Sequence, residues 1–378
     1  CTVCKGMYLK KLLGAHIRSC GKIHNVCVPR KGKVAVVEGK MLTPGAENMN
    51  KLFFTKVISK MKDDEIRDIV MKDSLILKYG ERLFTKKDVE EHTSNHISTR
   101  MRNLGHLVSA LQRANSGTKA RTLTEALNPQ NFNTLLEGVK DICKFNASTN
   151  RFSLGSKALK IGYSLKRCND ILRSEAAKKN DADLKAQTDA FDVAFTGDWA
   201  DFISSCARQS METAKFNAPK LLPTCEDVQT LYLYLKEKRE ENTGSEQYGE
   251  LVQRLLCQIS LLNRKRGGEV QRMKVADYEK SKTTKEMDPE IEQCLSPVER
   301  KLARFLHRIE IRGKFGRKVA ILLTPTMLED VERVITQRVE HSIESPYLFA
   351  SMSGERPIRG CDVIQRFAKE AQVKEPSV

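Results

Sequence analysis

The sequence predicts a mainly α-helical protein with a small antiparallel β-hairpin in its C-terminal third and a small finger-like module at its start. Apolar residues recur at helical spacing through most of residues 50–115, 122–216 and 251–262. Residues 305–323 form two strand-like runs on either side of a turn with two glycines, which is the pattern of a hairpin. Cysteine and histidine gather within the first twenty residues. The fold class is therefore helical, with an α+β end.

The chain carries a large positive charge. Its 378 residues include 65 Lys and Arg against 48 Asp and Glu, which gives a formal net charge of +17. The charge is spread along the chain rather than held in one tail, and this favours a broad surface that binds a polyanion. Nucleic acid is the commonest such partner. One alternative is that the partner is an acidic membrane surface. The other is that the protein is basic and has no polyanion partner.

Cysteine usage and hydropathy limit the compartment. Most of the eleven cysteines stand singly in apolar helical stretches, which fits a reducing compartment better than a disulfide framework. No apolar run approaches the ~18 residues that a membrane span needs, so we expect no membrane association. The chain opens with Cys1 and shows no signal peptide. We expect an intracellular protein. Because the first residue is not Met, we also expect this sequence to be a fragment at its N-terminal end.

The first twenty residues contain a metal-ligand pattern, C-x2-C-x11-H-x3-C. Zinc prefers four nitrogen or sulfur ligands in a tetrahedron, and a C-x2-C knuckle supplies two of them from one turn. A His and a Cys four residues apart lie on one face of a helix and supply the other two. The pattern predicts a C2HC zinc finger over residues 1–28 that holds a structural Zn²⁺ through Cys1, Cys4, His16 and Cys20.

Other features of this segment support the finger. Tyr8 and Leu13 fall where small zinc fingers place their two apolar core residues. The alternative is four unrelated residues with His16 on a helix surface, and His24 and Cys27 are weaker candidates as substitute ligands. If the finger folds, the cations of its helix suit phosphate contacts; these are Lys10, Lys11 and Arg18.

The middle of the chain is helical and basic. We predict a helical basic region over residues 50–121 and a helical domain over residues 130–217, and Thr224 with Asp227 marks the entry to a last domain, 220–378. Trp199 lies in an amphipathic run and is expected in a core. Cations cluster around residues 100–121, where they either touch DNA or form a solvated face; they are Arg100, Arg102, Arg113, Lys119 and Arg121.

The last third carries the most legible chemistry. An apolar helix over residues 251–262 runs directly into Arg264, Lys265 and Arg266, which two glycines and Glu269 follow. The two glycines reduce the constraint on the backbone at the end of this buried helix. The three cations there are therefore well placed to bind an anion. The predicted hairpin follows, and Lys314 stands at its turn beside Gly313. An amphipathic helix at 327–339 and a further helix near Arg359 complete the segment.

This order of elements resembles the catalytic domain of the tyrosine recombinases, the phage integrase-like family. In that family a buried helix ends in an Arg-x-x-Glu box, which Arg266 to Glu269 fits, and a hairpin turn then offers a lysine, which Lys314 fits. The resemblance covers about residues 220–378 and, more loosely, a helical DNA-clamp domain at 130–217. The preceding zinc finger is similar to the eukaryotic, Crypton-like branch, so we expect a nuclear protein.

The resemblance implies double-stranded DNA as the partner, self-association on DNA, and no small-molecule substrate. It implies DNA recombination and integration, in which a tyrosine attacks a phosphodiester without a catalytic metal or nucleotide. Cations must then stabilise the charge that develops on the phosphate oxygens. Arg266 would hold two of these oxygens, Glu269 would hold Arg266 in register, and Lys314 would give a proton to the leaving oxygen. Further contacts to DNA are expected from Arg264, Lys265, Arg317 and Lys318.

The sequence departs from the family at its end. No tyrosine follows Tyr347, and the second arginine box of the family is absent, which we interpret as truncation. Within the first box the arginine could be displaced by a residue or two, and Lys314 competes with Lys318 and Arg312. The first interpretation is therefore a recombinase, and the alternatives are a domesticated DNA-binding protein that no longer cuts, or a zinc-finger transcription factor whose helical body binds proteins.

Overall fold

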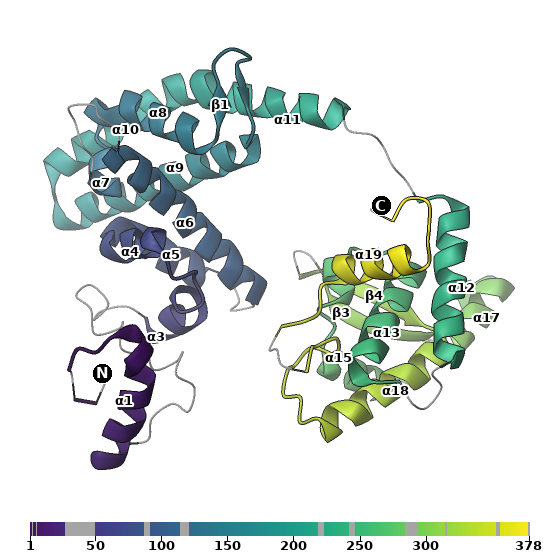
Figure 1. Ribbon diagram of the computed structural model, residues 1–378. Coiled ribbons are helices and arrows are strands. Elements are labelled where there is room, and N and C mark those ends of the chain that lie inside the picture. The colour runs from purple at the N-terminus through teal and green to yellow at the C-terminus, as the bar shows by residue number, and fades with distance from the viewer. Residues whose placement is uncertain are drawn as a thin grey trace. The chain divides into compact units, whose positions relative to one another are not determined.

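The computed structural model shows two compact units, Cys1–Ala218 (unit 1) and Pro219–Val378 (unit 2) (Figure 1). Helices dominate both units, and the described strands form two antiparallel two-stranded sheets. The prediction of a mainly α protein with a small antiparallel hairpin in its C-terminal part is confirmed. The structure describes residues 1, 3–4, 6–26, 50–86, 91–113, 121–217, 223–241, 246–283, 293–313, 316–352 and 356–376.

Unit 1 begins with the short helix of the predicted finger and continues as a helical assembly with one two-residue hairpin. Its described elements are α1 (Lys10–Ile23), α3 (Lys51–Phe53), the π-helix η1 (Phe54–Ile58), α4 (Glu65–Lys72), α5 (Ser74–Thr85), α6 (Glu91–Arg113), α7 (Leu123–Ala126), the 3-10 helix η2 (Pro129–Asn131), α8 (Phe132–Ile142), β1 (Phe145–Asn146), β2 (Arg151–Phe152), α9 (Gly155–Lys179), α10 (Ala182–Trp199), the π-helix η3 (Ala200–Ser204) and α11 (Ser205–Asn217).

Capping side chains explain where several of these helices begin. Asp64 caps α4, and Asp73 caps α5 by accepting hydrogen bonds from the backbone N–H groups of Leu75 and Ile76, both at 3.0 Å. The second oxygen of Asp73 accepts from the N–H of Leu123 at 2.6 Å. One buried carboxylate therefore starts α5 and also fixes α7 against it.

The main hydrophobic core of unit 1 extends from Phe53 to Ala207, and a small separate cluster lies at α1. The main core includes residues from both the 50–121 and the 130–217 ranges, so the two helical ranges that the sequence analysis separated share one core. Trp199 is 4% exposed, which confirms its predicted packing role. Its indole lies against Gly162 of α9, where a Cβ atom would be only 2.6 Å from the indole nitrogen.

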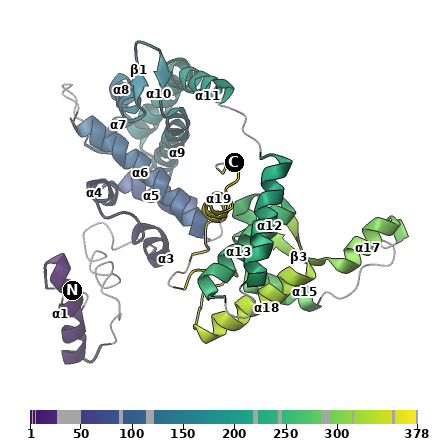
Figure 2. The same cartoon turned by 45° about the vertical axis from the view of Figure 1, so that its right-hand side comes forward.

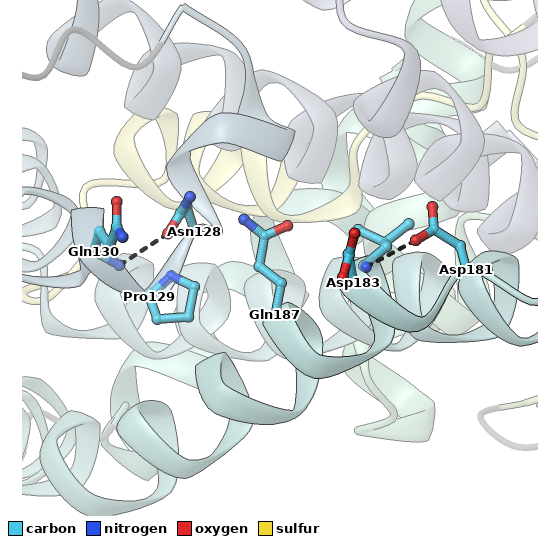
Figure 3. Close-up of a pocket in the computed structure, with 7 residues that line it drawn as sticks. Asn128, Pro129, Gln130, Asp181, Asp183 and Gln187 are labelled. Atoms are coloured by element: carbon cyan, nitrogen blue, oxygen red, sulfur yellow. Dashed lines mark hydrogen bonds between the residues drawn. The ribbon is translucent and has the colours of Figure 1, made fainter.

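One pocket on unit 1 lies between η2 and the start of α10 (Figure 3). Two of its polar side chains act in capping: Asn128 accepts from the N–H of Gln130, and Asp181 accepts from the N–H of Leu184, both at 3.0 Å. None of the residues predicted to bind metal or DNA lines this pocket.

Unit 2 contains the predicted buried helix, hairpin and final helices. Thr224 and Asp227 cap α12 reciprocally, with backbone-to-side-chain distances of 3.1 and 3.2 Å, as the sequence predicts. The described elements of unit 2 are α12 (Cys225–Glu241), α13 (Tyr248–Asn263), α14 (Gly267–Val270), α15 (Val275–Thr283), α17 (Pro297–Phe305), β3 (His307–Arg312), β4 (Lys318–Leu323), α18 (Pro325–Glu340) and α19 (Gly360–Glu370).

The core of unit 2 is built on α13, which packs against α18, α19 and β4. Strands β3 and β4 pair from His307 with Leu323 to Arg312 with Lys318, and Ile309 and Ile321 point into the core. Helix α17 extends away from the rest of this unit in Figure 2. No helix among the described residues combines the length and apolar character of a membrane span.

Candidate metal centre and nucleic-acid interface

The four predicted metal ligands converge. The Sγ atoms of Cys1, Cys4 and Cys20 and a ring nitrogen of His16 lie within 4.8 Å of one another. A tetrahedral site with Zn–S of about 2.3 Å and Zn–N of about 2.0 Å separates neighbouring S and N ligands by about 3.5 Å. The Cys4 Sγ to His16 Nε2 distance is 3.4 Å. The donor set and its spacing therefore fit a four-coordinate metal ion.

Helix α1 presents half of this cluster. His16 and Cys20 lie one turn apart on α1, and Leu13 and Ile17 pack with Cys1 and Cys20 in a small core. Tyr8 is 44% exposed and stacks on the His16 ring, with centroids 3.6 Å apart. Leu13 therefore takes its predicted core place, whereas Tyr8 covers the imidazole from outside.

The Cys4 thiol is electrostatically prepared for metal binding. A hydrogen bond from the backbone of Gly6, followed by one from His16, lowers the pKa of Cys4 to about 6. Because a thiolate is the metal-binding form of cysteine, a lowered pKa favours coordination. His24 is exposed at the end of α1, and Cys27 lies outside the described residues.

The cations predicted to bind DNA stand on an exposed turn. Helix α13 ends at Asn263, and Arg264 adopts a left-handed conformation (φ 48°) while its N–H bonds to the Ser260 carbonyl at 3.0 Å. This reversal carries Lys265 and Arg266 out of the helix, and all three cations are exposed. We call residues 264–266 the cationic turn.

A buried carboxylate lies beneath the cationic turn. Glu269 on α14 has a side chain only 8% exposed, and its Oε1 lies 3.6 Å from Nη1 of Arg266, whose side chain is 73% exposed. The same Oε1 is 3.4 Å from where a Cβ atom on Gly313 would stand. The structure thus brings together Arg266, Glu269 and the base of the β3–β4 turn.

The hairpin turn is closed by its own backbone. Gly313 donates to the Arg317 carbonyl at 2.7 Å, and Gly316 has a left-handed φ of 75°. A Cβ atom on Gly313 would lie 2.4 Å from the Val319 side chain, so a larger residue would require this contact to shift. Lys314 lies outside the described residues. Arg317 and Lys318 are exposed, and Lys318 pairs with Glu310 at 3.1 Å.

Two residues that position the cationic turn were not identified from the sequence. The Asn263 side chain donates to the Leu322 carbonyl and accepts from the Leu322 N–H, both at 2.8 Å, and so fixes the end of α13 to β4. Gln271 accepts from the N–H of Gly360 at 3.0 Å and holds the start of α19 beside α14. Neither residue type signals this role in sequence, because each acts through a backbone group far along the chain.

Comparisons with known proteins give limited similarity. No family model and no curated protein matches the sequence. Among solved structures, the chain is similar to the XerH site-specific recombinase bound to difH substrate in a pre-cleavage complex, with 12% identity and a TM-score of 0.45 over 85% of this chain and 78% of that one. For a post-cleavage complex of XerH with palindromic difH substrate, the sequence identity is 13% and the TM-score is 0.41. That match covers 85% of this chain and 77% of the other. These values do not define a function for this chain.

Proposed function

We propose that this chain is a DNA-binding protein of the tyrosine recombinase type, which binds the backbone of double-stranded DNA with its cationic turn. The observation that supports this most directly is the arrangement of an exposed arginine over a buried carboxylate that also adjoins the hairpin turn. A guanidinium held at one edge keeps its other N–H groups available for two phosphate oxygens. The net charge of +17 favours the same polyanion.

In the proposed reaction, a tyrosine hydroxyl attacks the scissile phosphate, and a phosphotyrosine bond forms while the bond to the leaving 5′ oxygen breaks. Arg266 binds this phosphate and stabilises the charge that develops on it. Glu269 holds the guanidinium in place from beneath. The lysine of the hairpin turn, Lys314, protonates the leaving oxygen, and Arg264, Lys265, Arg317 and Lys318 contact neighbouring phosphates. No cofactor enters these steps. Cys1, Cys4, His16 and Cys20 are proposed to hold a structural Zn²⁺, in a finger of the C2HC type. A nuclear location, a Crypton-like origin and self-association on DNA belong to the same proposal.

DNA binding by the cationic turn is tested by fluorescence anisotropy with a labelled duplex. Arg266→Gln should weaken binding about tenfold at fixed salt and lower the slope of log K against log salt by about 0.9. Lys301→Gln, which removes an exposed cation from α17, is the matched control. If the two substitutions weaken DNA binding equally, only the total charge matters, and this result would contradict a specific site at Arg266.

Strand cleavage is tested separately, with the intact protein and a nicked suicide DNA substrate. A covalent protein–DNA complex is expected, and Arg266→Gln should abolish it. If the protein binds DNA and no complex forms, the second candidate function holds: a domesticated zinc-finger DNA-binding or regulatory protein that no longer cuts. The observation that favours this candidate is the cluster of Cys1, Cys4, His16 and Cys20, because a structural metal site does not depend on any catalytic residue.

A further inference from the structure

The basic stretch around residues 100–121 contains cations with very different environments. Arg102 is engaged by both oxygens of Asp64, at 2.8 and 2.7 Å. Arg113 donates through Nε to the Ser109 carbonyl of its own helix. Lys119 lies outside the described residues, and Arg121 is exposed. Arg100, like Arg113, is oriented by neutral groups rather than paired with an acid, but its partners are the side chains of Tyr79 and His96 rather than a carbonyl of its own helix.

A directed chain of hydrogen bonds fixes Arg100. Ser164 of α9 donates to the Lys160 carbonyl at 2.9 Å, so its oxygen must accept the hydrogen of Tyr79, 2.9 Å away. The oxygen of Tyr79 then accepts from Nη1 of Arg100 at 3.3 Å. Tyr79 is fully buried on α5, and burial raises its pKa, so it stays a neutral phenol. The cation is therefore held without losing its charge.

The remaining faces of Arg100 point to a ligand. Its Nε donates to Nε2 of His96, one turn earlier on α6, at 3.3 Å. Two of its five N–H groups are thus used, and the other three have no acceptor among the described residues. Its guanidinium carbon lies 5.0 Å from the ring centroid of Tyr163, which is 64% exposed on α9. The cation–π contact and the two hydrogen bonds orient the guanidinium and leave its remaining N–H groups for a ligand.

A second cation lies one helical turn from Tyr163 on α9. Lys160 is exposed and lies three residues before Tyr163 on the same face of α9. In the described part of the chain it has no carboxylate partner, unlike Lys166 and Arg167 on the next turn, which approach Asp192 and Asp170. A preorganised guanidinium, an ammonium and a phenol hydroxyl suit a phosphodiester.

We propose that Arg100, Lys160 and Tyr163 form a second binding site for a backbone phosphate of duplex DNA, on the α6–α9 face of unit 1. Tyr79 is its positioning residue. This inference rests on the proposed function, since its ligand is the same DNA. It adds a contact in unit 1 that is chemically independent of the cationic turn.

The test uses the full chain and a labelled duplex, with anisotropy measured across a salt series. Arg100→Gln should weaken binding about five- to tenfold and lower the salt slope by about 0.9, because one phosphate contact is lost. Arg100→Lys should restore the salt slope but only part of the affinity, because an ammonium cannot bind two phosphate oxygens in the bidentate way that a guanidinium can. Arg208→Gln, an exposed cation on α11, is the control, expected to change affinity less than about twofold.

Tyr79→Phe tests the positioning role. It should weaken binding about two- to threefold in the wild-type chain and have no effect in the Arg100→Gln background, since its hydroxyl acts only through Arg100. Trp199 fluorescence would show whether Tyr79→Phe folds. If it does not fold, the affinities and salt slopes of Arg100→Gln and Arg100→Lys decide whether the site exists. If Arg100→Gln changes the affinity no more than Arg208→Gln does, the inference is overturned, and Arg266→Gln still tests the cationic turn. If the wild-type chain does not bind DNA, the proposed function itself is overturned.

Discussion

Asp330 is fully buried on α18 and accepts hydrogen bonds from three arginines. Its Oδ2 lies 3.0 Å from both Arg239 Nε and Arg254 Nη1, and its Oδ1 lies 3.3 Å from Arg333. Arg254 is itself fully buried, and Glu246 engages it from the other side at 2.6 Å. Because every buried charge here has a partner, removal of one member leaves the others uncompensated.

Substitution of Asp330 by Asn should therefore destabilise the chain strongly. We expect a loss of about 3–5 kcal/mol in the free energy of unfolding, measured by urea denaturation followed by circular dichroism. The matched control is Glu226→Gln, which breaks the exposed pair with Lys374 at 2.6 Å. An exposed pair contributes roughly 0–1 kcal/mol. Similar losses in the two variants would contradict a special role for burial.

Asp64 gives a pH-dependent contribution in unit 1. Hydrogen bonds from Arg102 are the main cause that lowers the pKa of its carboxyl from 3.8 to about 2. A carboxyl with a depressed folded-state pKa stabilises the fold above its unfolded pKa and loses this contribution as the pH falls through the folded value.

The stability difference between the wild-type chain and Asp64→Asn should accordingly be constant above about pH 4 and shrink as the pH falls from about 4 to about 2. Urea midpoints of both proteins across this range measure it. A difference that is the same at both ends of the range would show that Asp64 acts through shape or capping alone.

At the scale of elements, the metal cluster makes a separate prediction for α1. This helix has fourteen residues and a small core, and helices of this length are marginal in water without tertiary support. Cys20→Ser should abolish stoichiometric metal binding, which Co²⁺ substitution monitors through thiolate-to-metal absorption. A chelator should reduce helicity in the wild-type chain and leave Cys20→Ser unchanged. Equal Co²⁺ spectra in both proteins would exclude Cys20 as a ligand.

Elements with local signals were predictable from the sequence. Ligand spacing identified the cluster from Cys1 to Cys20, and Thr224 with Asp227 identified the start of α12. Alternation identified β3, and a short apolar run identified β4. Each of these depends on residues close together in the chain, so the pattern and the physical cause coincide.

Contacts between distant segments were not predictable in this way. The Asn263 clamp on Leu322 joins groups 59 residues apart, and the bonds of Asp330 with Arg254 and Arg239 join groups 76 and 91 residues apart. A lone Asn or Asp in sequence does not show which backbone or cation it meets. The same limit explains the candidate site: the Arg-x-x-Glu spacing predicted that Arg266 meets Glu269, whereas the approach of Gly313 to Glu269 required the fold.

At the scale of the whole molecule, the two units have separate hydrophobic cores. The chain contains a single tryptophan, Trp199, and it is buried in the core of unit 1. Its fluorescence therefore reports the unfolding of unit 1, whereas far-ultraviolet circular dichroism reports the helices of both units. Two cores that do not share buried residues need not unfold in one transition.

A matched pair of core truncations tests this separation. Leu165→Ala in unit 1 and Leu255→Ala in unit 2 each remove a fully buried side chain and should cost about 2–5 kcal/mol in the unit that contains it. Leu165→Ala should lower the urea midpoint of Trp199 fluorescence. Leu255→Ala should leave that midpoint unchanged and instead shift part of the circular dichroism transition to lower urea. A fluorescence midpoint that moves equally in both variants would mean that the two cores unfold cooperatively, because loss of packing in unit 2 would then be felt at Trp199.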